Sequence, residues 1–158
     1  VSARWLFKLL GAAAGAGFVL AVAEMLFLRT DMNLRVSAAG FLVAVSRIPL
    51  KIWSVRSLGR FWSIQIEVRS GQRLVTEGPY RYLRHPSYLS TIMEATGATL
   101  MMNAYLALVF MWLWYVPLLM LRLRLEEKEL IRHFGDEYEE YRRRTPALIP
   151  AGLLFGKK

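Results

Sequence analysis

Long apolar stretches constrain this chain more than any other feature of its sequence. The first extends from Trp5 to Leu28, with Lys8 near its start and Glu24 near its end, and the longest extends from Tyr88 to Leu121. A helix of about 20 apolar residues crosses the roughly 30 Å hydrocarbon layer of a bilayer. Because 55% of the 158 residues are hydrophobic, a water-soluble domain of this size would leave too much apolar surface uncovered. The sequence therefore predicts one integral membrane domain.

The expected fold is all-α, with about four transmembrane helices. A second, weaker apolar stretch covers residues 34–53 and carries charges that we expect to reach the membrane interface, among them Lys51. The stretch 88–121 is longer than one span needs, so we expect a helical hairpin that turns at residues 102–104. The first stretch has an alternative interpretation as a cleaved signal peptide, because small residues at 21–23 end its core.

Two polar segments flank the predicted hairpin, and we call them together the cap. Residues 57–86 contain several arginines and a Gly78-Pro79 turn, and residues 123–158 are charged, with a helix expected to stop at Gly135 and a last short helix before Pro146. Neither segment has enough apolar residues for a core of its own, so we expect them to fold onto each other. The single domain 1–158 would then comprise two transmembrane helices (1–56), a loop (57–86), the hairpin (87–122) and a C-terminal segment (123–158).

The distribution of basic residues predicts an orientation. Lys and Arg crowd the N-terminus and both cap segments, whereas the hairpin tip near Asn103 carries none. The positive-inside rule then places both termini and the cap on the cytoplasmic side. The formal net charge of +9 lies in short blocks rather than in a continuous stripe, so we predict contacts with anionic lipid and no nucleic-acid partner. With no cysteine and two histidines, no metal site is predicted.

Two motifs in the cap carry the chemical information. Residues 78–88 read GPYRYLRHPSY, and a glutamate pair at 126–127 is followed by HFGDEYEEY at 133–141 and by prolines at 146 and 150. This pattern resembles the isoprenylcysteine carboxyl methyltransferases and the related phospholipid methyltransferases, in which a G-x-Y segment precedes R-H-P-S-Y and a glutamate pair precedes F-G-x-x-Y-x-x-Y. The resemblance covers roughly residues 60–150.

The resemblance implies an enzyme that transfers a methyl group from S-adenosylmethionine to a lipophilic acceptor and releases S-adenosylhomocysteine. The expected reaction is carboxyl methylation of an isoprenylcysteine-like acceptor, with Arg122 binding the acceptor and both Arg122 and Glu126 acting in catalysis. The family's cofactor contacts fall on eleven positions of this chain: Gln65, Gln72, Arg73, Leu74, Val75, Tyr80, His85, Pro86, Ser87, Tyr88 and Glu126. The chain departs from the family pattern at Gln72 and Arg73, where His-Thr is usual, and at Ser90, where glycine is common.

The residue types agree with this chemistry. S-adenosylmethionine has a flat purine, a ribose diol, an amino-acid end and a sulfonium cation, which aromatic faces, a carboxylate and hydrogen-bond donors can bind. Tyr80, Tyr88, His85 and Glu126 supply those groups. On a continuous helix, Arg122 and Glu126 point the same way because they are four residues apart.

Each of these features also has a purely structural interpretation. Arg122 and Glu126 would form a helix-surface ion pair, His85 would cap the hairpin, and Tyr138 and Tyr141 would serve as packing and interfacial anchors. Glu94, inside an apolar stretch, is the candidate lining of an acceptor channel.

Three alternatives stay open from the sequence. A carboxylate acceptor needs no general base, whereas an amine acceptor such as phosphatidylethanolamine would need one of Glu126, Glu127 or Glu94. Membrane sterol reductases, which use a nicotinamide cofactor, have a similar C-terminal part, but with asparagine at the position of Ser87. A non-catalytic helical membrane protein would account for the spans but not for the motif residues.

Overall fold

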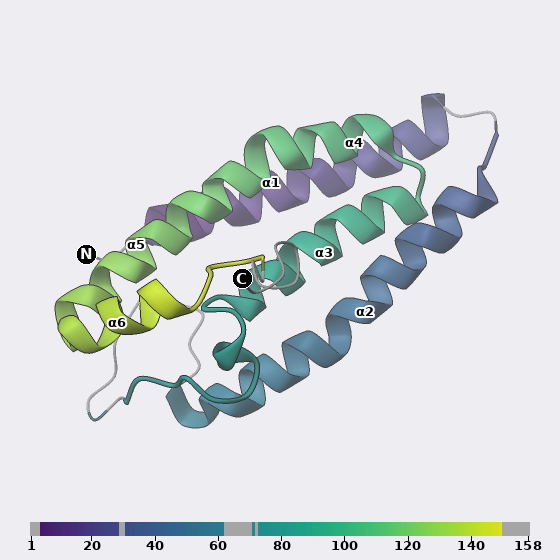
Figure 1. The fold of residues 1–158 in the computed structure, drawn as a ribbon. Coiled ribbons are helices and arrows are strands. Elements are labelled where there is room, and N and C mark those ends of the chain that lie inside the picture. Colours follow the sequence, from purple (N-terminus) through teal and green to yellow (C-terminus); the bar gives the residue numbers. More distant parts are fainter. Residues whose placement is uncertain (1–3, 29–30, 62–70, 72, 150–158) are drawn as a thin grey trace.

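The computed structural model describes residues 4–28, 31–61, 71 and 73–149, and all regular secondary structure in these residues is helical (Figure 1). The α-helices in chain order are α1 (Arg4–Ala23), α2 (Leu34–Leu58), α3 (Pro86–Met101), α4 (Tyr105–Phe110), α5 (Val116–Phe134) and α6 (Asp136–Arg144). Short segments of other helical types adjoin them, namely π-helical Glu24–Leu28 and Met111–Tyr115 and 3-10-helical Gly59–Phe61 and Gly78–Arg81. The prediction of an all-α fold is confirmed.

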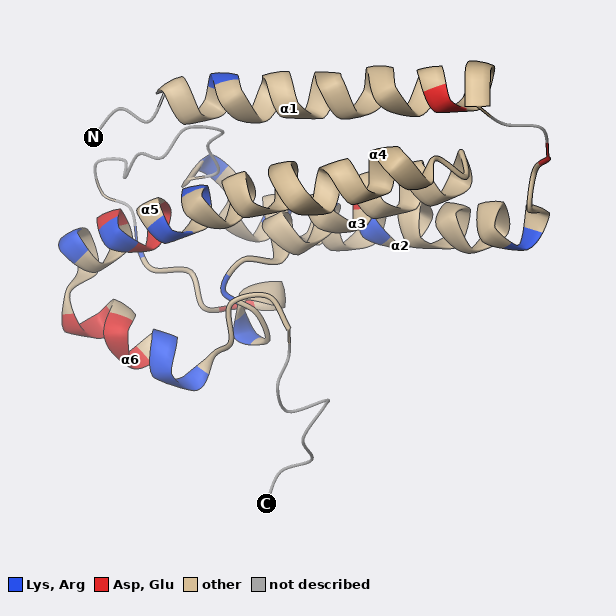
Figure 2. Ribbon diagram, turned by 90° about the horizontal axis from the view of Figure 1, so that it is seen from above, with Lys and Arg blue, Asp and Glu red and all other residues tan. Residues whose placement is uncertain are grey.

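The long helices form two packed groups. Helix α2 lies against α3 along most of its length, while α1 lies along α4, the π-helical segment Met111–Tyr115 and α5 (Figure 1). Helix α6 folds back beside the end of α5. Charged residues concentrate at this end of the molecule, in the second half of α5 and in α6 (Figure 2). The helical bundle therefore has one polar end, and we call the opposite end, where α3 turns into α4, the turn end.

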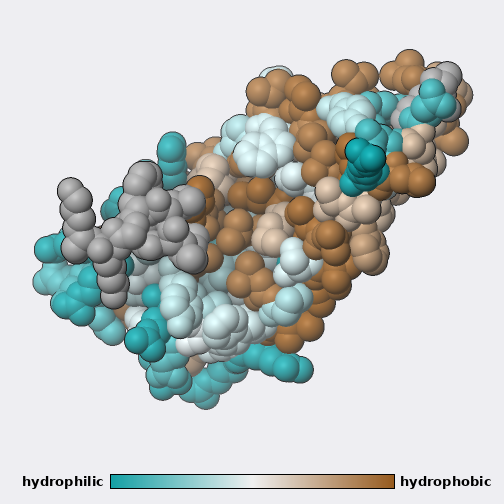
Figure 3. Space-filling view, turned by 45° about the vertical axis from the view of Figure 1, so that its right-hand side comes forward, coloured by the Kyte–Doolittle hydropathy of each residue, from teal (hydrophilic) through white to brown (hydrophobic). Residues whose placement is uncertain are grey.

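Three segments of the described residues are long and apolar enough to cross a membrane: Trp5–Leu28, Leu34–Phe61 and Tyr105–Phe134. Large apolar side chains on them face outward, including Phe18, Leu42 and Trp114, each more than 60% exposed. Figure 3 shows apolar side chains along the length of the bundle, with hydrophilic side chains at its two ends and more of them at the polar end. Such a surface requires lipid rather than water around it. Helix α3, with 16 residues, is shorter than these segments.

Helix α2 is longer than hydropathy alone predicted. We expected the apolar stretch to end at residue 53, and the helix continues past that point to Leu58. Ser54 is fully buried, and its hydroxyl donates to the carbonyl of Leu50 at 2.7 Å. The Tyr80 hydroxyl in turn donates to the carbonyl of Ser54 at 3.5 Å. Packing against the cap therefore keeps residues 54–58 helical. Hydropathy could not predict this extension, because it depends on contacts with a distant segment.

The hairpin turn lies where the sequence predicted it, at residues 102–104. Helix α3 ends at Met101, and Asn103 adopts a positive φ of 53°, a conformation that asparagine tolerates better than most residues. The Asn103 side chain accepts the N–H of Asn33 at 2.9 Å and donates to the Ser37 hydroxyl at 2.6 Å. These two bonds fasten the hairpin turn to the start of α2.

Glu24 has a structural role at the same end. It is 7% exposed, and its carboxylate accepts the backbone N–H groups of Leu106 at 3.0 Å and Ala107 at 3.2 Å. These are free donors at the start of α4, where the preceding Ala104 has no side chain able to cap them. An acidic residue in an apolar stretch is thus explained by the need to satisfy backbone groups in a medium without water.

Two glycines allow α2 and α3 to approach closely. Gly40 and Gly97 are buried against each other, and a Cβ at either position would overlap backbone atoms of the opposite helix. Helices in lipid lack a hydrophobic driving force between them, so close backbone packing at small residues is what holds them together. Ser90, one of the departures from the family pattern, is also fully buried here and donates to the carbonyl of Arg47 at 3.4 Å.

Replacing Gly97 by alanine is expected to destabilise the fold. The added methyl group would push α3 away from the backbone of Ala44, and overpacking of this kind costs about 1–3 kcal/mol. Thermal unfolding of detergent-purified protein, followed by tryptophan fluorescence, measures the change. Gly15→Ala is the matched control, because no described atom lies within 4 Å of the Cβ it would add. Equal midpoints for the two variants would contradict the proposed close packing.

Candidate active site

A cavity of about 400 Å³ lies at the polar end, between the two groups of long helices and the cap. Its volume is within the range typical of small-molecule sites. One wall is formed by Tyr115, at the end of the π-helical segment, and by the inner face of α5, where the lining residues follow the helical period: Leu119, Arg122, Glu126, Glu129, Leu130 and Phe134. The N-terminal half of α1, the C-terminal half of α2 and the start of α3 form the remaining helical walls.

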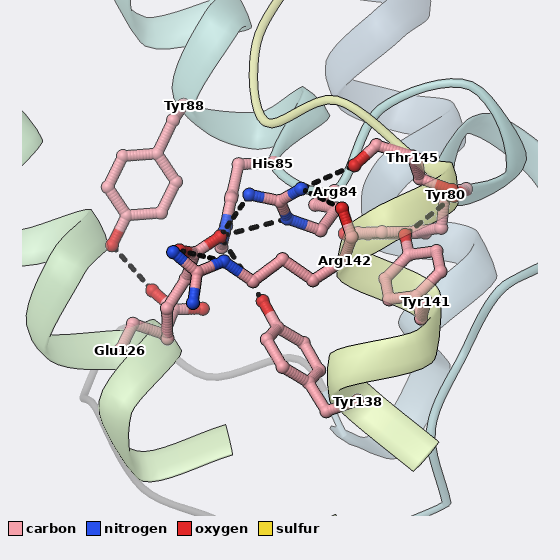
Figure 4. Close-up of polar contacts among 10 residues, drawn as sticks. Tyr80, Arg84, His85, Tyr88, Glu126, Tyr138, Tyr141, Arg142 and Thr145 are labelled. Atoms are coloured by element: carbon pink, nitrogen blue, oxygen red, sulfur yellow. Dashed lines mark hydrogen bonds and ion pairs between the residues drawn. The ribbon is translucent and has the colours of Figure 1, made fainter. Parts of the chain in front are cut away.

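The hydroxyl of Tyr88 connects the two residues expected to act in catalysis. It donates to a carboxylate oxygen of Glu126 at 2.5 Å, a contact visible in Figure 4, and it accepts from Nε of Arg122 at 3.2 Å. All three side chains line the cavity. A guanidinium and a carboxylate are thereby held one helical turn apart, facing the same space, and the Tyr88 hydroxyl bridges them.

A second carboxylate, Glu127, anchors the cap. Its Oε1 accepts from Nε of Arg84 at 2.9 Å and from the hydroxyl of Tyr138 at 3.4 Å, and it lies 3.1 Å from Nε2 of His85 (Figure 4). The side chains of Arg84 and Glu127 are 9% and 11% exposed. Arg84 also donates to the carbonyls of Arg142 and Thr145. One buried ion pair thus joins the loop before α3 to α5 and to the end of α6.

Further bonds bring the two cap segments together, as predicted from their lack of separate cores. The hydroxyl of Tyr141 donates to the carbonyl of Tyr80 at 2.6 Å, and the backbone N–H of His85 donates to the carbonyl of Ala147 at 3.0 Å. Burial raises the pKa of both Tyr138 and Tyr141 above the usual range, so both hydroxyls remain protonated donors. The two tyrosines expected to be anchors therefore hold the cap through hydrogen bonds, and both also line the cavity.

The structure brings most of the predicted site residues to this cavity. Those that line it are Arg73, Leu74, Val75, Tyr80, His85, Ser87, Tyr88, Arg122 and Glu126. Pro86 begins α3 and is fully buried behind the lining. Glu94 is not among the described lining residues, and it forms an ion pair with Arg47 at 2.8 Å. Gln65 and Gln72 lie outside the described residues.

Some lining residues were not predicted. Glu129, Leu130 and Phe134 follow the helical period of Arg122 and Glu126, so extending that period along α5 would have found them. The contribution of α1, from Phe7 to Ala14, has no such signal, because an apolar helix in a membrane looks the same whether it faces lipid or a cavity. Lys51 on α2, which we expected to reach the membrane interface, also lines the cavity.

Comparison with known proteins identifies methyltransferases among the proteins that this chain resembles. Residues 39–132 match the family model described as the isoprenylcysteine carboxyl methyltransferase (ICMT) family. The protein-S-isoprenylcysteine O-methyltransferase of Schizosaccharomyces pombe is 36% identical over 77 residues, which are 49% of this chain and 33% of that protein. The methanethiol S-methyltransferase of Crocosphaera subtropica is 35% identical over 79 residues, which are 50% of this chain and 29% of that protein.

A solved structure agrees in fold. The eukaryotic intramembrane Ras methyltransferase ICMT superimposes with a TM-score of 0.72 and 24% sequence identity, covering 89% of this chain and 51% of that one. The chain therefore spans about half or less of each of these three proteins. The shared fold and the apolar helices make it a multi-pass integral membrane protein.

Removing the charge of Glu127 is expected to destabilise the cap strongly. Glu127→Gln would leave the buried guanidinium of Arg84 without its counter-ion, and breaking a buried pair in this way costs about 3–5 kcal/mol. Thermal unfolding in detergent and limited proteolysis of the C-terminal segment would measure the loss. The control is Glu139→Gln on α6, the same change in an exposed residue 3.9 Å from Arg143, which should leave stability unchanged. Comparable stability of the two variants would contradict the anchoring role.

Proposed function

Because the chain belongs to the isoprenylcysteine carboxyl methyltransferase family, we propose that it is a membrane methyltransferase that uses S-adenosylmethionine to methylate a lipophilic acceptor. The proposed reaction is carboxyl methylation of an isoprenylcysteine-like compound. The observation that carries this proposal is the cavity in which the Tyr88 hydroxyl joins Arg122 to Glu126. The family match covers all three residues.

The residues at the polar end of the cavity fit S-adenosylmethionine. The hydroxyl of Ser87 is buried beside the side chain of Tyr80 and makes no hydrogen bond of ordinary geometry in the described part of the chain, so a bound molecule would satisfy it. Tyr80 and Phe134 offer aromatic faces for a purine, and Glu126 offers a carboxylate for a cation. When bound, S-adenosylmethionine supplies a methyl group on a sulfonium sulfur, which keeps the electron pair of the broken C–S bond as an acceptor lone pair forms the new bond.

The chain's own contribution is to bind and align. An acceptor carboxylate is ionised at neutral pH, so Arg122 would bind and orient it without removing a proton. Tyr88 holds Arg122 and Glu126 in fixed positions relative to each other, which sets how the two bound molecules meet. Glu127 is occupied by Arg84, His85 and Tyr138, so it supports the site rather than serving as a base.

The acceptor's apolar part would reach the cavity from the bilayer. Helices α1 and α2 belong to different packed groups and both line the cavity, α1 with Phe7, Leu10, Gly11 and Ala14 and α2 with Lys51 and Leu58. An apolar chain between them would remain in contact with lipid, whereas the water-soluble cofactor would arrive through the cap.

The proposed topology has four crossings with the cap in the cytoplasm. Helix α3 would be the fourth span, since its 16 residues reach about 24 Å at 1.5 Å per residue and a local thinning of the bilayer accommodates the difference. Basic residues at the polar end, among them Arg124, Lys128 and Arg132, support a cytoplasmic cap. Among the described residues at the turn end, Arg35 is the only basic one.

Saturable binding of S-adenosylhomocysteine is the expected outcome of isothermal titration calorimetry on detergent-purified protein. Tyr88→Phe and Glu126→Gln should each weaken binding about tenfold, because the first removes the hydrogen bond that fixes the Glu126 carboxylate and the second removes its negative charge. Tyr82→Phe is the matched control, since Tyr82 belongs to the same motif but is 57% exposed and should not affect binding.

The same titration with NADPH tests the reductase alternative. Binding of NADPH in place of S-adenosylhomocysteine would refute the assignment of the cofactor. Equal affinity for S-adenosylhomocysteine in the wild type and in the Tyr88 and Glu126 variants would refute the assigned site. Methyl transfer to phosphatidylethanolamine vesicles but not to N-acetyl-S-farnesylcysteine would refute the carboxyl acceptor while leaving the enzyme class intact.

A further inference from the structure

Lys51 occupies an unusual position for a lysine in a membrane-spanning helix. It lies on α2, partly buried, and lines the cavity together with Thr91 of α3 and Arg122 of α5. No hydrogen bond or ion pair within the described residues holds its ammonium group. A charge in a membrane-spanning helix is costly, and such residues usually face a polar partner or a functional cavity. Lys51 faces a cavity.

The charged side chains that act most directly on Lys51 include more cations than anions. Lys51 interacts electrostatically with one anionic side chain, Glu94, and with two cationic side chains, Arg47 and Arg122. Glu94 is engaged by Arg47 at 2.8 Å, which leaves less of its charge to compensate Lys51. Two positive side chains, one from α2 and one from α5, thus border the same space.

The cavity also has an apolar wall. Phe7 and Leu10 come from α1, where Gly11 and Ala14 leave room beside them, and Leu119 comes from α5. A slender hydrocarbon chain fits such a wall, and an anionic group at its end would meet Lys51 and Arg122. An ammonium group placed between Lys51 and Arg122 would be repelled by both, whereas the carboxylate of Glu126, one helical turn further along α5, faces the space assigned to the cofactor.

We propose that Lys51 and Arg122 form a two-cation subsite that selects acceptors with an anionic, carboxylate-bearing end over acceptors with an amine end. This inference rests on the methyltransferase function proposed above and assigns Lys51 as a determinant of acceptor specificity. Arg122 contacts the reacting group, and Lys51 adds the second positive charge that excludes ethanolamine-type lipids.

Two probes with the same hydrocarbon chain test the proposal. N-acetyl-S-farnesylcysteine ends in a carboxylate, and S-farnesylcysteamine ends in an amine. Methyl transfer from S-adenosylmethionine to the first is measured with the full chain in detergent, and the second is added as a competing inhibitor. The variants are Lys51→Met, which keeps the length of the side chain without its charge, and Lys51→Arg, which keeps the charge. Arg56→Met, an exposed position on the same helix, is the control.

The expected result is a change in opposite directions for the two probes. Lys51→Met should raise KM for the acid about tenfold and strengthen inhibition by the amine, with the affinity for S-adenosylhomocysteine unchanged. Lys51→Arg and Arg56→Met should behave like the wild type. A merely structural role would affect both probes in the same direction, and unchanged affinity for S-adenosylhomocysteine verifies that the variant is folded.

Two results would overturn the proposal and can be told apart. Transfer to the acid by wild-type protein with an unchanged KM in Lys51→Met would refute the role of Lys51 alone. Absence of transfer to the acid by wild-type protein that binds S-adenosylhomocysteine would refute the proposed acceptor and, with it, the subsite.

Discussion

The buried carboxylate of Glu127 is the interaction on which the polar end of this protein depends. It binds Arg84 and Tyr138 and lies beside His85, and Arg84 in turn binds the backbone at the end of α6. The loop before α3 and the last helix therefore have one shared anchor. Its neighbour Glu126 points into the cavity instead. Adjacent glutamates on one helix face different directions, so one builds the site and the other is available to a ligand.

The membrane part obeys a second constraint, which is that backbone polar groups in lipid must be satisfied within the protein. Glu24 meets this requirement at the start of α4, and Asn103 meets it at the hairpin turn. Where no polar side chain is needed, close packing suffices, as at Gly40 and Gly97. Some polar residues within the apolar stretches thus complete the backbone, whereas others, such as Lys51, face the cavity.

Much of this organisation could be predicted from the sequence, and what could not has identifiable causes. Hydropathy and turn residues located the helices and the stop at Gly135 because these signals are local. The family motif identified Tyr88 as a site residue. The structure then showed that its hydroxyl contacts Glu126 and Arg122. The length of α2, the wall supplied by α1 and the position of Lys51 depend on which helices pack together. That information lies in contacts between distant segments, and an apolar helix carries little trace of it.

The hydrogen bonds at Asn103 also have a mechanical consequence. Because they fasten α2 to the hairpin at the turn end, α2 can be treated as a lever whose pivot lies there. Lys51 is about 27 Å along the helix from Asn33 at 1.5 Å per residue, so a tilt of about 5° would displace it by about 2 Å. A change in the tilt of α2 would thus alter the distance between Lys51 and the opposite helices, but it would have to displace α3 as well, because these two helices pack along most of their length.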